Sequence, residues 1–530
     1  MDGGSLSDTQ RTMVLPLLQE TNIRGRPYVT VSSKGIANGL SRYPNDGADF
    51  GPDTTLGATA PGQYGSPYTE TSGVQEGVNF IPNGGIVKLG DGHFIISETI
   101  TVASYAVTIE GTGYGDTGYA TEITVNGNID GFDFTTGYGG AVKNMFIQGS
   151  GSTSSAAINH TSTAGQGFRV ENVRIGGFYN GIVLTSAGNS FVNNILFGTI
   201  TGSAITVNGG YDVMISNCLG GGTSSTYALN GINLLDTGAF WILNCDFTNC
   251  STGLNIAPPS GSMVVNGFVY GLSCDTGNIG MYMSGQNGLI QSITFVNCWT
   301  SSNSNSGGII ENGTPTGLTF IGLRAILNGK EGWYIIGGTE IEFDDCFFIA
   351  NNTTNSPQTG GVGSGLEFSG LSASIYRVKG GKSTNSSSFG FSAGYQQYGI
   401  TIGAATMEQY SIIGVDVTGN LSVGISDSGT ATVSKILKDN LGFNPTGLVG
   451  VSTPAIGASG ATYTNNLGYP VRIYVLSAPS GTTYNILGTH GNNLGSAVPM
   501  VAGQQITLDN DVGITVFYTT APTWRWYGGN

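Results

Sequence analysis

Ten short stretches between residues 170 and 415 align on one column of turn residues, and their apolar positions agree in every stretch. The turn column consists of Asn172, Asn194, Asn217, Asn244, Asn266, Asn297, Gly322, Asp345, Gly380 and Gly414. Two residues before it stand Val170, Val192, Ile215, Ile242, Val264, Phe295, Phe320, Phe343, Val378 and Ile412. One residue after it stand Val173, Ile195, Cys218, Cys245, Gly267, Cys298, Leu323, Cys346, Gly381 and Val415. Because apolar and polar positions alternate and Val, Ile, Phe and Thr prevail, these stretches are predicted to be strands.

The spacing of the turn column ranges from 22 residues (Asn172 to Asn194) to 35 residues (Asp345 to Gly380). Repeats of this length are typical of solenoids, in which each repeat buries its apolar face against its neighbours. The high glycine content, 88 of 530 residues, fits a chain that needs several tight corners in each repeat. The sequence therefore predicts an all-β protein whose main part is a right-handed parallel β-helix with a column of Asn-rich turns.

The chain is expected to divide into three parts. Residues 1–55 are interpreted as an N-terminal attachment segment, and residues 56–445 as the β-helix with its N-terminal cap. A short helix is expected at Thr12–Glu20, and helical spacing recurs from Gly73 to Phe80. Residues 446–530 are predicted to form a small C-terminal β-sandwich-like domain.

The C-terminal domain follows a Gly-, Pro- and Ser-rich stretch at residues 444–460, and its strands alternate clearly. It ends with Trp524, Trp526 and Tyr527 close together. Three interpretations of these aromatic residues stay open: the core of the domain, an oligomer contact, or a platform that stacks on sugars.

The charge of the chain excludes several classes of function. The formal net charge is −15 and the sequence pI is near 4.5, whereas a nucleic-acid-binding surface has to be basic. No run of 18 apolar residues occurs, so no membrane span is expected. The first 20 residues lack the basic and apolar regions of a secretory signal. Release with a virus particle would be one route to the outside of a cell.

Four of the six cysteines share the inward column after the turn, where a free thiol acts as a small apolar side chain. These four are Cys218, Cys245, Cys298 and Cys346. A disulfide that involves Cys250 or Cys274 is the alternative. The chain has three histidines, none of them near a cysteine pair, so neither a metal nor another cofactor is expected.

A stripe of outward side chains follows the turn column on four successive repeats. It consists of Trp299, Arg324, Phe347 and Lys382. Aromatic faces stack on sugar rings, and Arg or Lys donates hydrogen bonds to hydroxyls or carboxylates. These residues are therefore candidates for glycan binding. The alternative is that a loop or a neighbouring subunit covers Trp299 and Phe347.

A second candidate is a pair of carboxylates, Glu342 and Asp344, which point outward from one predicted strand. Residues two apart on a strand are roughly 6–7 Å apart, a separation that suits the acid/base pair of a glycosidase. Arg377 and Lys379 occupy the equivalent positions on the next repeat. The alternative interpretation is therefore a ladder of ion pairs between repeats.

Residues 84–94 carry a G-G-x-V-x-L-x-x-G-x-F element directly after the helical stretch. Its residues are Gly84, Gly85, Val87, Leu89, Gly92 and Phe94. This element resembles the start of the pectate-lyase-like parallel β-helix proteins, which include phage and virus tailspikes as well as polysaccharide lyases and hydrolases. The resemblance covers about residues 44–440. It implies the fold, a surface role and, for tailspikes, a homotrimer.

These observations favour a virion surface spike that contacts host-cell glycans, with or without depolymerase activity. The expected partners are a host surface polysaccharide or glycoprotein and, through the N-terminal segment, other virion proteins. The expected location is extracellular, on the virion surface. A secreted polysaccharide lyase or glycoside hydrolase is the alternative, and it would need a concentrated acid, His or calcium site. A non-catalytic structural or adhesin-like protein is the third interpretation.

Overall fold

The computed structural model describes most of the chain, and all structural statements refer to the described residues. These are residues 28–34, 48–81, 83–115, 120–135, 138–151, 153–162, 166–223, 226–313, 315–357, 361–369, 374–385, 395–444, 449–488 and 491–528. The expected helix at Thr12–Glu20 lies outside them, as does most of residues 1–55, the expected attachment segment. The helical spacing before residue 81 is confirmed by the short helix α2 (Val74–Phe80).

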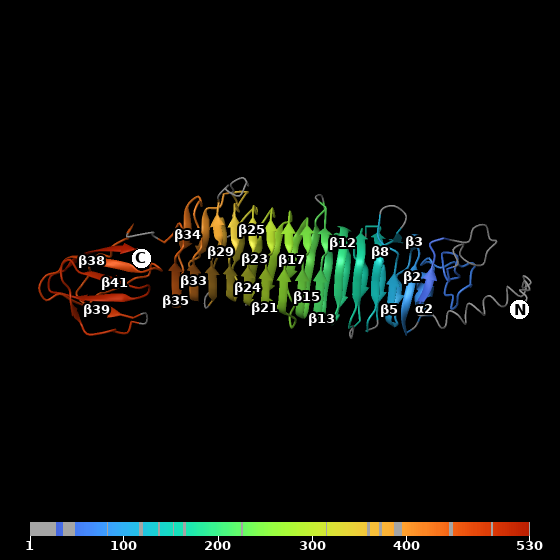
Figure 1. Cartoon of the computed structure of the whole chain (residues 1–530), viewed down its shortest axis with the longest axis horizontal. Coiled ribbons are helices and arrows are strands. Elements are labelled where there is room, and N and C mark those ends of the chain that lie inside the picture. Colours follow the sequence, from blue (N-terminus) through green and yellow to red (C-terminus); the bar gives the residue numbers. More distant parts are fainter. Residues whose placement is uncertain are drawn as a thin grey trace, which may run out of the picture. The chain divides into compact units, whose positions relative to one another are not determined.

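The chain is all-β, with 57% strand and 2% helix, and forms a right-handed parallel β-helix of about 12 turns. The fold class expected from the sequence is therefore confirmed. By its internal contacts the chain consists of two compact units, residues 1–303 and residues 304–530. Figure 1 shows the stacked strands of the first unit, from blue to green. No helix among the described residues is long and apolar enough to cross a membrane.

Each turn of the first unit contributes strands to three sheets. Sheet 1 contains β1 (Tyr28–Val31), β2 (Asn83–Leu89), β5 (Tyr105–Glu110), the first parts of β8 (Ala141–Gly149), β10 (Arg169–Gly176) and β12 (Phe191–Thr199), the last parts of β13 (Ser203–Ser216) and β15 (Ala228–Leu243), β18 (Met263–Tyr270) and β21 (Leu289–Val296). Sheet 2 contains β3 (Gly92–Ile96), β6 (Thr121–Val125), the last parts of β8, β10 and β12, β14 (Leu219–Gly221), β16 (Asp246–Thr248), β19 (Ser273–Asp275) and β22 (Trp299–Ser301). Sheet 3 contains β4 (Ile100–Val102), β7 (Phe132–Phe134), β9 (Ala156–His160), β11 (Asn180–Thr185), the first parts of β13 and β15, β17 (Cys250–Ile256) and β20 (Ile279–Gly285).

The β-helix of the second unit has three sheets in the same order along the chain. Its sheet 1 contains β24 (Thr316–Ile321), β27 (Thr339–Asp344), β30 (Ile375–Lys379), β33 (Thr406–Ile413) and β35 (Thr430–Lys438). Its sheet 2 contains β25 (Arg324–Ile326), β28 (Phe347–Ile349) and β31 (Lys382–Thr384). Its sheet 3 contains β23 (Gly308–Gly313), β26 (Trp333–Ile335), β29 (Ser364–Phe368), β32 (Tyr398–Ile402) and β34 (Val423–Asp427).

The turn column lies where sheet 1 bends into sheet 2, and the backbone there is left-handed. Nine of the ten predicted residues occupy it, with φ between 50° and 70°. Asparagine tolerates this conformation better than other residues with a Cβ atom. Its amide also joins neighbouring turns, because Asn194 Nδ2 donates to Asn172 Oδ1 over 2.8 Å and Asn172 Nδ2 donates to Asn144 Oδ1 over 3.1 Å. These bonds stabilise the bend and explain its sequence signature.

One repeat was aligned wrongly by the sequence pattern. Ile242 pairs with Val269 in the register of β15 and β18, so the turn residue of this repeat is Gly271, with a φ of 63°. Val264 and Asn266 lie five residues before Val269 and Gly271, and Asn266 is in a second left-handed conformation within sheet 1. The sequence pattern does not distinguish the two positions. Val264 is fully buried, like the residues of the apolar column, and Asn266 has a φ of 57°, like the residues of the turn column.

The interior of the β-helix is apolar throughout the predicted inward columns. In the second unit, the Phe320 and Phe343 rings stack with centroids 4.8 Å apart and an angle of 11° between their planes. Trp333 meets Phe320 edge-on at 4.6 Å. All six cysteines are buried and free, so the disulfide alternative is wrong. Burial raises the pKa of the Cys298 thiol to about 12, which keeps it protonated and apolar in the core.

The C-terminal part of the second unit consists of two four-stranded antiparallel sheets. One contains β36 (Val449–Gly450), β43 (Thr523–Gly528), β38 (Val471–Ser477) and β41 (Gln505–Leu508). The other contains β37 (Thr462–Thr464), β42 (Gly513–Phe517), β39 (Thr483–Leu487) and β40 (Val498–Pro499). Trp524 and Trp526 are buried in the core of these sheets. The core interpretation is therefore confirmed for these two residues and the sugar-platform interpretation is wrong for them, whereas Tyr527 is half-buried.

Backbone groups of the last β-helix turn pair with this C-terminal part. Leu437 N donates to the Gly468 carbonyl over 2.9 Å, and Gly468 N donates to Asn510 Oδ1 over 2.7 Å. Asn510 Nδ2 in turn donates to the Lys435 carbonyl. An open end of a solenoid exposes unpaired backbone groups, and these contacts satisfy two of them, Leu437 N and the Lys435 carbonyl.

Candidate glycan-binding surface

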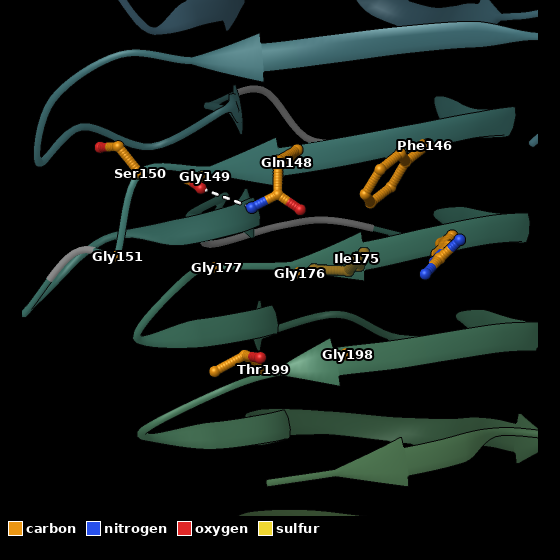
Figure 2. A pocket seen from close by; sticks show the side chains of 11 residues that line it. Phe146, Gln148, Gly149, Ser150, Gly151, Ile175, Gly176, Gly177, Gly198 and Thr199 are labelled. Carbon is orange, nitrogen blue, oxygen red and sulfur yellow. Dashed lines mark hydrogen bonds between the residues drawn. The ribbon is translucent and has the colours of Figure 1, made fainter. Parts of the chain in front are cut away.

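The first candidate surface lies on sheet 2 of the first unit, where β8, β10 and β12 run side by side (Figure 2). Phe146 pairs with Arg174 in this register, and Arg174 pairs with Leu196. Their side chains face outward because the residues on either side of each, such as Met145 and Ile147, are buried. The alternation that fills the core thus places an aromatic ring, a guanidinium and an alkyl chain on one outer column.

The Phe146 and Arg174 side chains border a hollow of about 470 Å³. The Arg174 guanidinium carbon lies 4.9 Å from the centroid of the Phe146 ring. Gln148 Nε2 donates to the Gly149 carbonyl over 2.7 Å, as Figure 2 shows. This bond fixes the amide and turns its Oε1 towards Gly176, where a Cβ atom would lie 3.1 Å from that oxygen.

The bottom of the hollow is made of glycine on successive turns. At Gly198 a Cβ atom would have ordinary contacts, the nearest at 3.5 Å, so the missing side chain leaves open space on the outside. Gly177 is different, because its φ is 72° and a Cβ atom would lie 2.3 Å from the Gly149 carbonyl oxygen. Only glycine fits at that corner. Sequence reasoning missed this hollow, although its signal was glycine two residues after Arg174 and two residues after Leu196.

The hollow combines the groups that bind a sugar ring. An aromatic face packs against the C–H groups of a pyranose, and a guanidinium and an amide oxygen fix the orientation of its hydroxyls. At the half-buried Gly177 and Gly198 no side chain stands between the backbone and a sugar ring, so the ring can approach closely. No pKa shift or metal ligand is needed for this kind of recognition.

The four glycan-binding residues predicted from the sequence belong to both units. Trp299 lies in the first unit, on β22, where it pairs with Ser273 and is half-buried. Arg324, Phe347 and Lys382 are consecutive in the register of sheet 2 of the second unit. The structure therefore places these last three residues on one outer column, as predicted.

Two interactions hold this column of the second unit. The Arg324 guanidinium carbon lies 5.9 Å from the Phe347 ring centroid. Lys382 Nζ lies 2.8 Å from Asp416 Oδ2, and about a quarter of each side chain is exposed. Burial alone would raise the pKa of Asp416, but hydrogen bonds from Lys382 and Thr418 hold this pKa below its usual value. The lysine is thus oriented before any ligand arrives.

The predicted carboxylate pair faces the basic pair in the expected register. Glu342 pairs with Arg377, and Asp344 pairs with Lys379. Lys379 Nζ lies 3.6 Å from Asp344 Oδ2, and the lysine side chain is 68% exposed. This contact supports the interpretation as a ladder of ion pairs. The catalytic role of Glu342 and Asp344 stays a prediction.

The single variants Glu342→Gln and Asp344→Asn distinguish the two roles. We expect each to change the free energy of unfolding by no more than about 1 kcal/mol, because exposed ion pairs contribute little. We also expect glycan turnover, if the wild type shows any, to stay the same. A loss of turnover by orders of magnitude with intact binding would show instead that the carboxylates are catalytic. Thermal melting and product release measure the two effects.

Sequence reasoning missed a second acidic pair, Glu331 and Glu367, in the second unit. Both are buried, with exposed fractions of 0% and 2%. Val362 N donates to Glu367 Oε2 over 3.0 Å, and Gly363 N donates to Glu331 Oε1 over 3.1 Å. Burial is the main cause that raises the pKa of Glu367, to about 7, and the nearby Glu331 adds to it. The two carboxylates hold a loop segment against sheet 3.

No protein-family model matches the chain, and no curated protein matches it. Similar solved structures include the A-module of mannuronan C-5 epimerase AlgE6 from Azotobacter vinelandii, with 13% identity, 68% of this chain and 92% of that chain covered, and a TM-score of 0.44. A tailspike protein double mutant of E. coli bacteriophage HK620 has 12% identity, covers 84% of this chain and 86% of its own, and has a TM-score of 0.44. The catalytic unit of a GH87 α-1,3-glucanase from Streptomyces thermodiastaticus has 15% identity and a TM-score of 0.42, and the match covers 77% of this chain and 70% of that chain. At these identities the likeness concerns the fold.

Proposed function

We propose that this chain is a virion surface spike whose β-helix binds glycans on the host cell. The observation that carries the proposal is the hollow on sheet 2 of the first unit, which Phe146, Arg174, Gln148 and several glycines line. Figure 2 shows Phe146, Gln148 and these glycines. A protein of net charge −15 is repelled by nucleic acid, whereas a sugar is bound by local stacking and hydrogen bonds.

A β-helix suits this task because its outer columns repeat at every turn. A polymer can contact several turns at once, so weak contacts with single sugars add up to useful affinity. The residues predicted from the sequence, Trp299 in the first unit and Arg324, Phe347 and Lys382 in the second, are part of the proposal as further contacts. The proposal also includes attachment to other virion proteins through residues 1–55 and assembly as a homotrimer.

The proposal is tested by screening the purified protein against host envelope polysaccharides, with binding and release of reducing ends both recorded. We expect binding to at least one polysaccharide, and about tenfold weaker binding for Phe146→Ala, which corresponds to the loss of one stacking contact. Gly198→Thr should also weaken binding, because it fills the hollow at a position where a Cβ atom meets no close neighbour. Release of products would add depolymerase activity to binding.

Tyr227→Ala serves as the matched control, because Tyr227 is an exposed aromatic residue outside the hollow. It should bind like the wild type. If no polysaccharide binds, the proposed function is wrong. If Phe146→Ala and Gly198→Thr both keep wild-type affinity, the hollow is not the contact, and the columns of the second unit become the next candidates.

A further inference from the structure

A second outer column of the first unit carries large side chains on five successive turns. Sheet 1 pairs Arg169 with Phe191, Phe191 with Met214, Met214 with Trp241 and Trp241 with Phe268. Arg169 and Phe268 are exposed, and the three residues between them are half-buried. The candidate residues predicted from the sequence did not include this column.

The column borders a hollow of about 380 Å³ that reaches from Arg169 to Trp241. Its remaining lining is polar and comes from the corner before the strands. Asn189 and Asp212 stand there in left-handed backbone conformations, with φ of 50° and 55°, and both side chains are exposed. The hollow therefore combines aromatic faces with an amide and with charges of both signs.

We propose that this column is a track for a polysaccharide chain that runs along the solenoid, with about one sugar on each turn. Neighbouring strands are about 4.8 Å apart, which is close to the length of one pyranose in an extended polysaccharide. Successive sugars can therefore meet Phe191, Met214 and Trp241 in turn. The inference rests on the proposed function and adds to it a second binding site with a defined length.

The lining favours a polysaccharide over a second copy of this chain. The centre of a protein interface is depleted of charged residues, whereas Arg169 and Asp212 line this hollow together with Phe191 and Trp241. Charged groups beside aromatic faces suit a sugar ligand, because each sugar ring has apolar C–H faces that stack on aromatic rings and hydroxyls at its edge that form hydrogen bonds.

The neighbours of the column set the length of the track. The position before Arg169 is Ala141, and the position after Phe268 is Thr294. Both side chains are too small to extend the stacking surface. Affinity should therefore rise with the length of the oligosaccharide up to about five sugars and then level off, because a longer chain finds no further aromatic face.

The experiment uses oligosaccharides of one to eight residues, cut from the polysaccharide that the wild type binds, in calorimetric titrations of the full chain. We expect Trp241→Ala to bind the hexamer about tenfold or more weakly and to change the affinity for the monosaccharide little, because a single sugar makes at most one contact of the track and has no others to combine with it. Trp241→Phe keeps an aromatic face and should restore most of the affinity. Tyr270→Ala is the matched control, because Tyr270 lies on the same strand as Phe268 with a similar exposed fraction, outside the hollow.

Three outcomes would overturn the inference. In the first, Trp241→Ala and Trp241→Phe bind the hexamer like the wild type, which rejects the track while glycan binding itself stands. In the second, Trp241→Ala dissociates an oligomer without changing affinity, which identifies the column as an interface between copies. In the third, the wild type binds no polysaccharide, and the proposed function and the track fail together. Circular dichroism of each variant shows whether the β-helix is intact.

Discussion

Replacing Phe343 with alanine is expected to lower the stability of the second unit by about 3–5 kcal/mol, through lost burial and the cavity that remains. The ring is fully buried and stacks on Phe320 at 4.8 Å. Trp333, Phe348 and Phe368 surround it within 6.2 Å. So many rigid neighbours cannot collapse into the space of a phenyl ring, so the cavity is expected to persist.

Thermal unfolding and hydrogen exchange of the strands β24, β27 and β30 measure this loss. A solenoid can open locally, so faster exchange in these strands is expected even where the global transition moves little. Phe347→Ala is the matched control, since its ring lies four residues away on the outer surface and is only half-buried. Unchanged melting together with unchanged exchange in the flanking strands would contradict a core role for Phe343, and Phe320→Ala should repeat the result.

Replacing Glu367 with glutamine is expected to remove a strong pH dependence of stability. Burial raises the pKa of Glu367 from 4.5 to about 7, so the folded chain binds this proton more tightly than the unfolded chain does. The stabilisation is complete below pH 4.5 and is lost as the pH rises through 7. A difference of this size corresponds to about 3 kcal/mol.

The free energy of unfolding of Glu367→Gln relative to the wild type should therefore rise from near zero at pH 4.5 to about 3 kcal/mol at pH 8. The amide oxygen can still accept hydrogen bonds from Val362 and Ser364, which now donate to the carboxylate. Denaturant unfolding at four pH values between 4.5 and 8 measures the difference. Glu342→Gln, at a half-buried position of sheet 1, controls for the change in net charge. A constant difference across this pH range would show that Glu367 does not titrate as inferred.

The groups that face Glu367 come from the neighbouring turns. Tyr334 pairs with it on the turn before and Thr401 on the turn after, while Glu331 approaches from the loop before β26. Burial, with Glu367 and Glu331 as further causes, raises the pKa of Tyr334, so this hydroxyl stays neutral across the range tested. Glu367 is therefore the group whose change of charge between pH 4.5 and 8 affects how firmly the segment at Val362 is held.

The candidate sites show how far outward-facing residues can be predicted. Trp241 stands one residue before Ile242 of the apolar column, so its outward direction could have been read from the same alignment that revealed the core. Phe191 and Met214 hold the equivalent places before Val192 and Ile215. The same place before Phe343 and Val378 holds Glu342 and Arg377, which belong to the predicted carboxylate and basic pairs, whereas the stripe that begins at Trp299 lies two residues after the turn.

The sequence by itself determined the fold, the inward columns and the Asn-rich turns, because a period of two decides locally which way each strand side chain points. Even there, Asn266 was aligned in place of the turn residue Gly271. Both residues are left-handed and have buried neighbours, so the sequence pattern alone does not distinguish them. Only the tertiary structure decided what covers each outward side chain. Glu367 points away from the core and is nevertheless buried, whereas the surface beside Arg174 lies open, because loops and glycines distant in sequence decide where solvent reaches the sheet.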